Sequence, residues 1–173
     1  MNRQGPVTDH NPEDSGQSTD PELDNPGVRI PPPLVYLAAV LIGAAIDQFI
    51  PVRVLPASLT GWLGGALVLL ALTITGWSVR EFRKAQTTIR PDRPVSVTVT
   101  TGPFQYTRNP MYLALSILQV GIGIWMNSVW VVVLLIPVLI WVTRRVIAAE
   151  EQYLVRKFGQ AYLDYQAKVR RWL

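Results

Sequence analysis

Four apolar segments constrain the fold of this chain more than any other feature. They span Leu34–Ile50, Leu59–Val79, Met111–Trp125 and Val129–Thr143. A helix needs roughly 17 to 25 apolar residues to cross the hydrocarbon core of a bilayer, so the first two segments predict transmembrane helices. The other two hold about 15 residues each and are separated by Met126–Ser128, a pattern that predicts a short helical hairpin. The sequence therefore predicts an all-α integral membrane protein with about four transmembrane helices.

Positive charge predicts how these helices are oriented. Basic residues concentrate at Arg80–Arg108, between the second and third segments, and at Arg156–Arg171. Short loops rich in Lys and Arg stay on the cytoplasmic side of a membrane. We therefore expect both termini and the central loop in the cytoplasm, with the protein in a bacterial inner membrane. The same distribution accounts for the net charge of +4, so the expected partner is the lipid bilayer rather than nucleic acid. No pattern indicates an oligomeric state.

The segments outside the apolar runs have simpler compositions. Residues 1–33 are rich in Pro, Gly, Ser, Asp and Glu, which predicts a disordered acidic tail before a membrane domain at 34–173. Residues Val95–Val99 alternate like a strand but have no second strand to pair with, so we expect an extended segment. Residues Arg144–Val169 keep a helical period and predict a cytoplasmic helix, or two helices broken at Gly159.

Some residue types narrow the possible chemistry. The chain has no cysteine, and its one histidine, His10, lies in the polar tail. This excludes cysteine nucleophiles, a Ser-His-Asp arrangement and multi-histidine metal sites, so no metal is expected. Gly61 and Gly65 form a small-residue pattern that predicts close helix packing. Asp47 lies inside the first span, near its outer end, where we expect a structural role.

The turn-rich stretch Thr101–Tyr112 directly precedes the third apolar segment. Proline is favoured at the first position of a helix, so Pro110 predicts a helix start with Arg108 and Asn109 at its N-terminus. Free backbone N–H groups and the helix dipole favour an anionic or carboxylate-bearing ligand there. The alternative for Arg108 is a cation that only sets membrane topology.

Two adjacent carboxylates, Glu150 and Glu151, have no basic residue three or four positions away. Their positive partner must therefore come from another segment, such as Arg108, or from a ligand. The alternative is a solvated pair. Together with these carboxylates, aromatic side chains could form a cage for a sulfonium or ammonium group, although each alone is typical of a membrane interface. The tyrosines in question are Tyr112, Tyr162 and Tyr165.

Three motifs in order make the chain similar to a known family. They are Thr101-Gly-Pro-Phe-x-Tyr-x-Arg-Asn-Pro-Met-Tyr112, then Glu150–Glu151, then Phe158-Gly-x-x-Tyr162-x-x-Tyr165. Over Phe82–Leu173 the chain resembles the isoprenylcysteine carboxyl methyltransferases and the related phospholipid methyltransferases. The resemblance implies a membrane enzyme that uses S-adenosylmethionine, bound between the loop before the third helix and the helix after the fourth.

The resemblance also implies which residues form that site. One wall would hold Arg108, Asn109, Pro110 and Tyr112, and the other would hold Glu150, Glu151, Tyr162 and Tyr165. The prenylcysteine enzymes have a histidine where this chain has Asn109. The resemblance therefore predicts cofactor binding better than it predicts the identity of the methyl acceptor.

Methyl transfer from a sulfonium requires alignment and desolvation more than a histidine or cysteine. A lipophilic or small acceptor with a carboxylate could be oriented by Arg108 without a base. An amine or thiol acceptor would need a proton acceptor, for which Glu150 or Glu151 is available. Arg108 and Glu150 are thus the catalytic candidates. Two alternatives are a nicotinamide-dependent membrane reductase of the sterol or enone type and a non-catalytic membrane scaffold.

Overall fold

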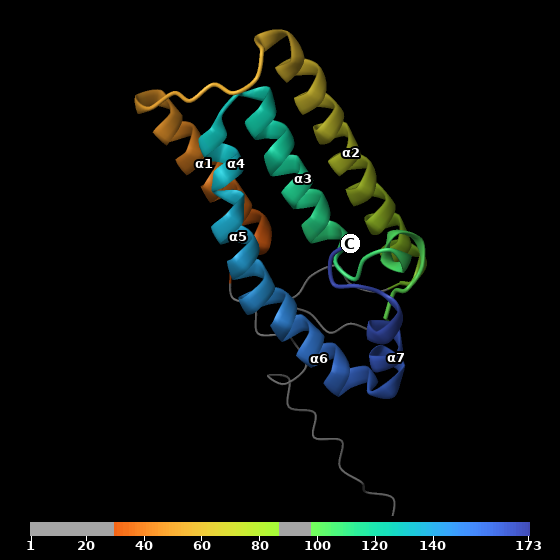
Figure 1. Ribbon diagram of the computed structural model, residues 1–173. Coiled ribbons are helices and arrows are strands. Elements are labelled where there is room, and N and C mark those ends of the chain that lie inside the picture. The colour runs from red at the N-terminus through yellow and green to blue at the C-terminus, as the bar shows by residue number, and fades with distance from the viewer. Residues whose placement is uncertain (1–29, 87–97) are drawn as a thin grey trace, which may run out of the picture.

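The computed structural model of the protein describes residues 30–86 and 98–173, and this part is entirely helical (Figure 1). The expected all-α membrane fold is confirmed. The predicted tail up to residue 29 and the segment 87–97, which includes most of the expected extended stretch, lie outside the described residues. The elements are α1 (Pro32–Phe49), α2 (Ala57–Lys84), the 3₁₀ turn η1 (Gly102–Gln105), α3 (Pro110–Trp125), α4 (Val129–Val133), α5 (Leu135–Trp141), the π-helical segment η2 (Val142–Ile147), α6 (Ala148–Phe158) and α7 (Gln160–Lys168).

Among the described residues, three helices are long and apolar enough to cross a membrane: Pro32–Phe49, Ala57–Lys84 and Val129–Phe158. The helix α3 is a fourth, shorter apolar helix. Two predicted ends are wrong, because α2 continues past Val79 and the fourth helix continues past Thr143. The residues that follow are mostly good helix formers, and leaving the apolar run does not by itself end a helix.

The fourth helix is irregular at two places along its length. Pro137 has no backbone N–H and its ring crowds the preceding turn, which accounts for the interruption at Leu134 between α4 and α5. Further on, the π-helical segment inserts an extra residue into the turn. The last two residues of this segment, Val146 and Ile147, are both fully buried. Gly159, with a φ of +54°, ends α6 and confirms the predicted break.

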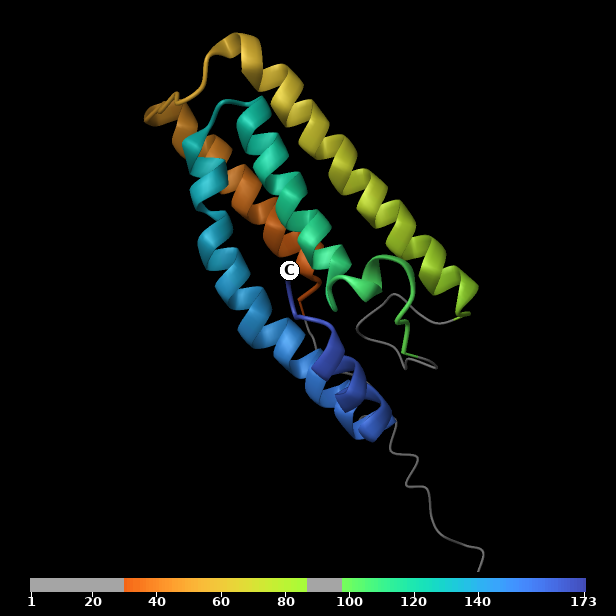
Figure 2. The same cartoon turned by 45° about the vertical axis from the view of Figure 1, so that its right-hand side comes forward.

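The helix α3 lies between α2 on one side and α1 with α4 on the other (Figures 1 and 2). A Cβ added to Gly64 would lie 2.6 Å from the backbone nitrogen of Trp125, and one added to Gly121 would lie 3.0 Å from Leu67. The expected packing through Gly61 and Gly65 is wrong, since a Cβ at either would meet no described atom within 4 Å. The close approach of α2 to α3 occurs at Gly64, which precedes Gly65 in the sequence.

Four helical passes place the start of α1, the end of α2, the start of α3 and the α6–α7 region at one end of the bundle (Figures 1 and 2). This is the arrangement that the even number of crossings predicts. The cytoplasmic side of the membrane remains a prediction for this end, which we call the proximal end.

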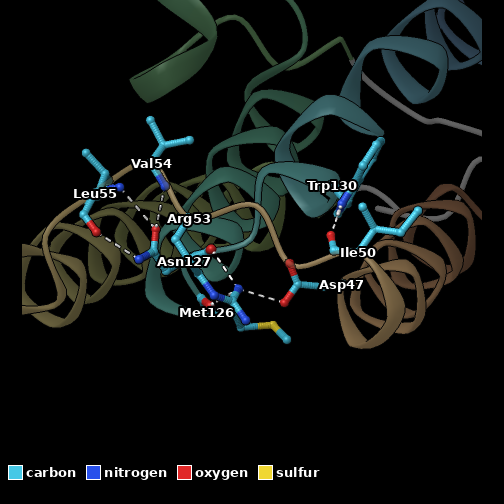
Figure 3. Close-up of polar contacts among 8 residues, drawn as sticks. All are labelled: Asp47, Ile50, Arg53, Val54, Leu55, Met126, Asn127 and Trp130. Atoms are coloured by element: carbon cyan, nitrogen blue, oxygen red, sulfur yellow. Dashed lines mark hydrogen bonds and ion pairs between the residues drawn. The ribbon is translucent and has the colours of Figure 1, made fainter.

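A polar cluster joins the two connections at the opposite, distal end (Figure 3). Asp47, at the end of α1, pairs with Arg53 at 2.7 Å, and Arg53 donates to the backbone carbonyl of Asn127 at 2.9 Å. The Asn127 side chain then bonds both backbone groups of Leu55. Trp130 also donates its indole N–H to Ile50. Arg53 therefore links Asp47, at the end of α1, to the α3–α4 turn.

Candidate functional site

The loop before α3 is attached to the end of α2. Glu81 is buried in α2 and accepts hydrogen bonds from Thr101 Oγ1 at 2.7 Å and from Lys84 Nζ at 2.6 Å. Gly102 has a φ of +62°, and a Cβ there would lie 2.6 Å from Glu81 Cγ. Only glycine fits this conformation and space without strain. Phe104 then packs edge-on against the ring of Phe82 in α2.

Asn109 is the N-cap of α3 and Pro110 its first residue, as predicted. The chain segment 169–173 crosses this helix start (Figure 2). Arg108 donates its backbone N–H to the Arg170 carbonyl at 2.9 Å, and Asn109 Nδ2 donates to the Arg171 carbonyl at 2.9 Å. Thr107 Oγ1 donates to the same Arg171 carbonyl at 3.1 Å. The Asn109 side chain thus holds a segment of the protein itself.

The Glu151 carboxylate contacts two arginines from distant segments. Its Oε1 lies 3.2 Å from Arg108 Nη1 and accepts from Arg171 Nε at 3.0 Å, and its Oε2 accepts from Arg171 Nη2 at 2.5 Å. The prediction that its positive partner comes from another segment, such as Arg108, is confirmed. A solvated carboxylate is wrong for Glu151, which is 8% exposed. Arg108 is also mostly buried, which favours more than a topology-setting role.

Glu150 faces a different neighbour, on α3. Tyr112 donates its hydroxyl to Glu150 Oε1 at 2.6 Å. The hydroxyl of Tyr36 in α1 donates to the backbone carbonyl of Tyr112 at 3.4 Å. The same hydroxyl is hydrogen-bonded to the Ser116 hydroxyl at 3.0 Å. In the part of the chain that the structure describes, no cation lies within ion-pair distance of Glu150. The two adjacent glutamates therefore have separate partners, a phenol and two guanidinium groups.

Tyr162 and Tyr165 lie together on α7, with ring centroids 5.9 Å apart. Burial, together with the nearby Glu151 carboxylate, raises the pKa of Tyr162 to about 12, and nearby Arg108 opposes the rise. Burial also raises the pKa of Tyr165, whose hydroxyl donates to the Phe104 carbonyl at 2.7 Å. Both side chains therefore remain neutral phenols at physiological pH.

A pocket of about 450 Å³ opens beside the Glu151 carboxylate. Charged, polar and apolar side chains of α6, α7 and the 169–173 segment line it: Ala148, Glu151, Gln152, Val155, Arg156, Gln166 and Arg171. Ligand pockets in proteins commonly have volumes of roughly 300–1,000 Å³. The guanidinium Nε of Arg108 is buried without a hydrogen-bond partner among the described residues. In the same part of the chain, no group of acidic, histidine or cysteine side chains is placed to hold a metal ion.

The structure brings the eight predicted residues to the proximal end. Arg108 and Asn109 contact the 169–173 segment or Glu151, Pro110 is buried at the start of α3, Tyr112 contacts Glu150, and Tyr162 and Tyr165 form a pair on α7. The sequence reasoning missed Arg171 as a partner of Glu151. The available signal was the adjacent pair Arg170–Arg171, at the end of the region that resembles the methyltransferases.

Comparison with known proteins shows the family of this chain. Residues 59–161 match the phospholipid methyltransferase family, which covers more than half of the chain. An uncharacterized protein from Haemophilus influenzae is 38% identical over 65 residues, which is 36% of this chain and all of that protein. No solved structure matches the chain. The nicotinamide reductase alternative gains no support. This helical membrane protein is therefore a methyltransferase that belongs to the phospholipid methyltransferase family.

Proposed function

We propose that the protein transfers a methyl group from S-adenosylmethionine to a lipophilic or small acceptor at its proximal end. One observation supports this proposal above the others. Arg108 and Glu151, which lie far apart in the sequence, form a buried ion pair beside a 450 Å³ pocket in a member of a methyltransferase family. Buried ionisable groups in such a pocket are typical of functional sites.

The residues at this end suit the charges of S-adenosylmethionine. Its sulfonium and ammonium groups need negative or aromatic neighbours, which Glu151 and the neutral Tyr162 and Tyr165 would supply. Its carboxylate needs a cation, and Arg108 has a buried Nε with no described partner. We infer that these residues bind the cofactor, with Asn109 and Pro110 shaping the start of α3.

The bound cofactor would supply an activated methyl group. Transfer of that group would leave the cofactor's sulfur neutral and place the methyl carbon on the acceptor. A carboxylate acceptor releases no proton, and Arg108 would orient it. An amine or thiol acceptor releases one proton, which Glu150 would accept, with Tyr112 holding its carboxylate at 2.6 Å.

We further propose that the proximal end faces the cytoplasm of a bacterial inner membrane. The excess of basic residues in Arg80–Arg108 and Arg156–Arg171 supports this orientation. The cofactor is polar, so at the end of a membrane bundle it would enter the site from water, and a lipophilic acceptor would enter from the bilayer.

Calorimetric titration of the detergent-purified protein tests the proposal. S-adenosylmethionine and its demethylated product, S-adenosylhomocysteine, should both bind, and NADPH should not. Binding of NADPH alone would favour a reductase. If none of the three ligands binds to folded protein, the scaffold alternative gains and the proposed cofactor is wrong.

A further inference from the structure

The two arginines on Glu151 are not equivalent. The Arg108 side chain is 12% exposed and comes from the loop that is attached to α2 and the 169–173 segment. The Arg171 side chain is 40% exposed and lines the pocket, yet it makes both shorter contacts, at 3.0 and 2.5 Å. The better-placed cation is thus the one with more freedom to move toward solvent.

The backbone beside Arg171 is held independently of its side chain. The Arg171 carbonyl accepts from Thr107 and Asn109, and the Arg170 carbonyl accepts from Arg108. Next along the chain, Trp172 packs against the buried cluster that includes Tyr36 and Val142. The guanidinium can therefore leave Glu151 while the segment stays in place.

The Glu151 carboxylate and its two guanidinium partners together carry a net positive charge, so the cluster repels a third positive group at close range. A cationic ligand that binds Glu151 must replace one of them, because nearby like charges disfavour each other's charged forms. We propose that Arg171 is an internal competitor, whose guanidinium is exchanged for the positive group of the ligand on the Glu151 carboxylate. This inference rests on the proposed function, since it takes the ligand to be S-adenosylmethionine.

If Arg171 competes with the ligand, its removal should increase affinity. Removal of an arginine that supports the site or binds the ligand would not increase affinity. Arg171→Gln removes the competitor, so S-adenosylmethionine should bind about three- to tenfold more tightly, as fits the loss of a partly exposed ion pair. Tightening should be smaller for S-adenosylhomocysteine, which lacks the sulfonium charge. If Arg171 instead contacts the cofactor or only supports the site, the same change should weaken binding.

Calorimetry on four variants tests this. Arg170→Gln is the matched control, because it removes the neighbouring positive charge while its backbone contact to Arg108 is kept, and it should leave affinity within about twofold. In Glu151→Gln the carboxylate charge is gone, so adding Arg171→Gln should give no further tightening. Thermal unfolding of each variant checks that it is folded.

The outcomes separate the two proposals. Tighter binding by Arg171→Gln that disappears in the Glu151→Gln background supports the exchange. Unchanged or weaker binding by folded Arg171→Gln overturns it, while the cofactor assignment stands if the unmodified protein binds. Absence of binding by the unmodified protein overturns both. If Arg171→Gln does not fold, Arg171→Lys replaces it: lysine lacks the two-pronged contact, so binding should tighten by about twofold, and weaker binding overturns the exchange.

Discussion

The distal and proximal ends of the bundle each contain a buried carboxylate paired with arginine, but the surroundings differ. Asp47 has one guanidinium partner, Arg53, whose remaining contacts are to backbone carbonyls in the neighbouring turn. Glu151 has two guanidinium partners and lies beside a pocket and near the tyrosine pair of α7, of which Tyr162 is buried. An ion pair whose partners only join two connections is a structural contact. One with excess positive charge beside a pocket can respond to a ligand.

The sharpest test of the comparison asks whether the two ends lie on opposite sides of the membrane. The chain has no cysteine, so single substitutions can be labelled specifically. Val54→Cys lies at the distal end and is 67% exposed, and Lys168→Cys lies at the end of α7. An impermeant thiol reagent should label only position 54 in intact cells and both positions in broken cells. Labelling of position 168 from outside would reverse the proposed orientation.

The next largest effect is expected from Glu151→Gln. This change removes the negative charge with which Arg108 and Arg171 pair. Charge-assisted contacts of this kind are worth about 1.5 to 3 kcal/mol, so S-adenosylmethionine affinity should fall roughly tenfold or more. The loss should be smaller for S-adenosylhomocysteine. Glu150→Gln is the paired variant, and titration of both ligands shows whether either carboxylate interacts with the sulfonium charge. An equal loss for the two ligands would mean that Glu151 contacts a group they share.

Asp47→Asn is expected to lower the stability of the protein and to leave its affinity for the cofactor unchanged. The carboxylate side chain is 5% exposed, and its loss leaves Arg53 without an ionic partner, so the protein should be destabilised by about 1 to 3 kcal/mol. Cofactor affinity should stay unchanged, because the cluster lies at the other end of the bundle. Thermal unfolding in detergent and calorimetric titration measure the two effects. A clear loss of affinity in stably folded Asp47→Asn would show that the distal cluster is coupled to the site.

The smallest effect concerns the tyrosines beside Glu151. The folded-state pKa of Tyr162 is raised to about 12 from 10. The associated stability is fully present below pH 10 and is lost as the pH rises through about 12. Phenolate formation can be followed by ultraviolet titration of the unmodified protein and of Tyr162→Phe. The difference between the two curves is the signal of Tyr162, which should ionise near pH 12. Ionisation of Tyr162 near pH 10 would mean that its side chain is solvated.

Several local features of the fold and site could be predicted from the sequence. Apolar length indicated the spans, Asn109–Pro110 marked the start of α3, and Gly159 marked the break between α6 and α7. The missing intrahelical partner of Glu151 correctly required a cation from elsewhere, whereas the described residues bring the Tyr112 hydroxyl and no cation to Glu150. Apolar length is a property of a whole segment, and the other signals depend on residues within one or two helical turns, where backbone geometry limits which side chains meet.

Other features were decided by the tertiary structure. The π-helical segment, the use of Gly64 in place of Gly61 and Gly65, and the pairing of Arg171 with Glu151 depend on how helices approach each other. Any of several arginines near the membrane surface could have supplied the second cation. Only the path of the 169–173 segment, held across the start of α3 by hydrogen bonds to its backbone carbonyls, brings the Arg171 guanidinium to this carboxylate.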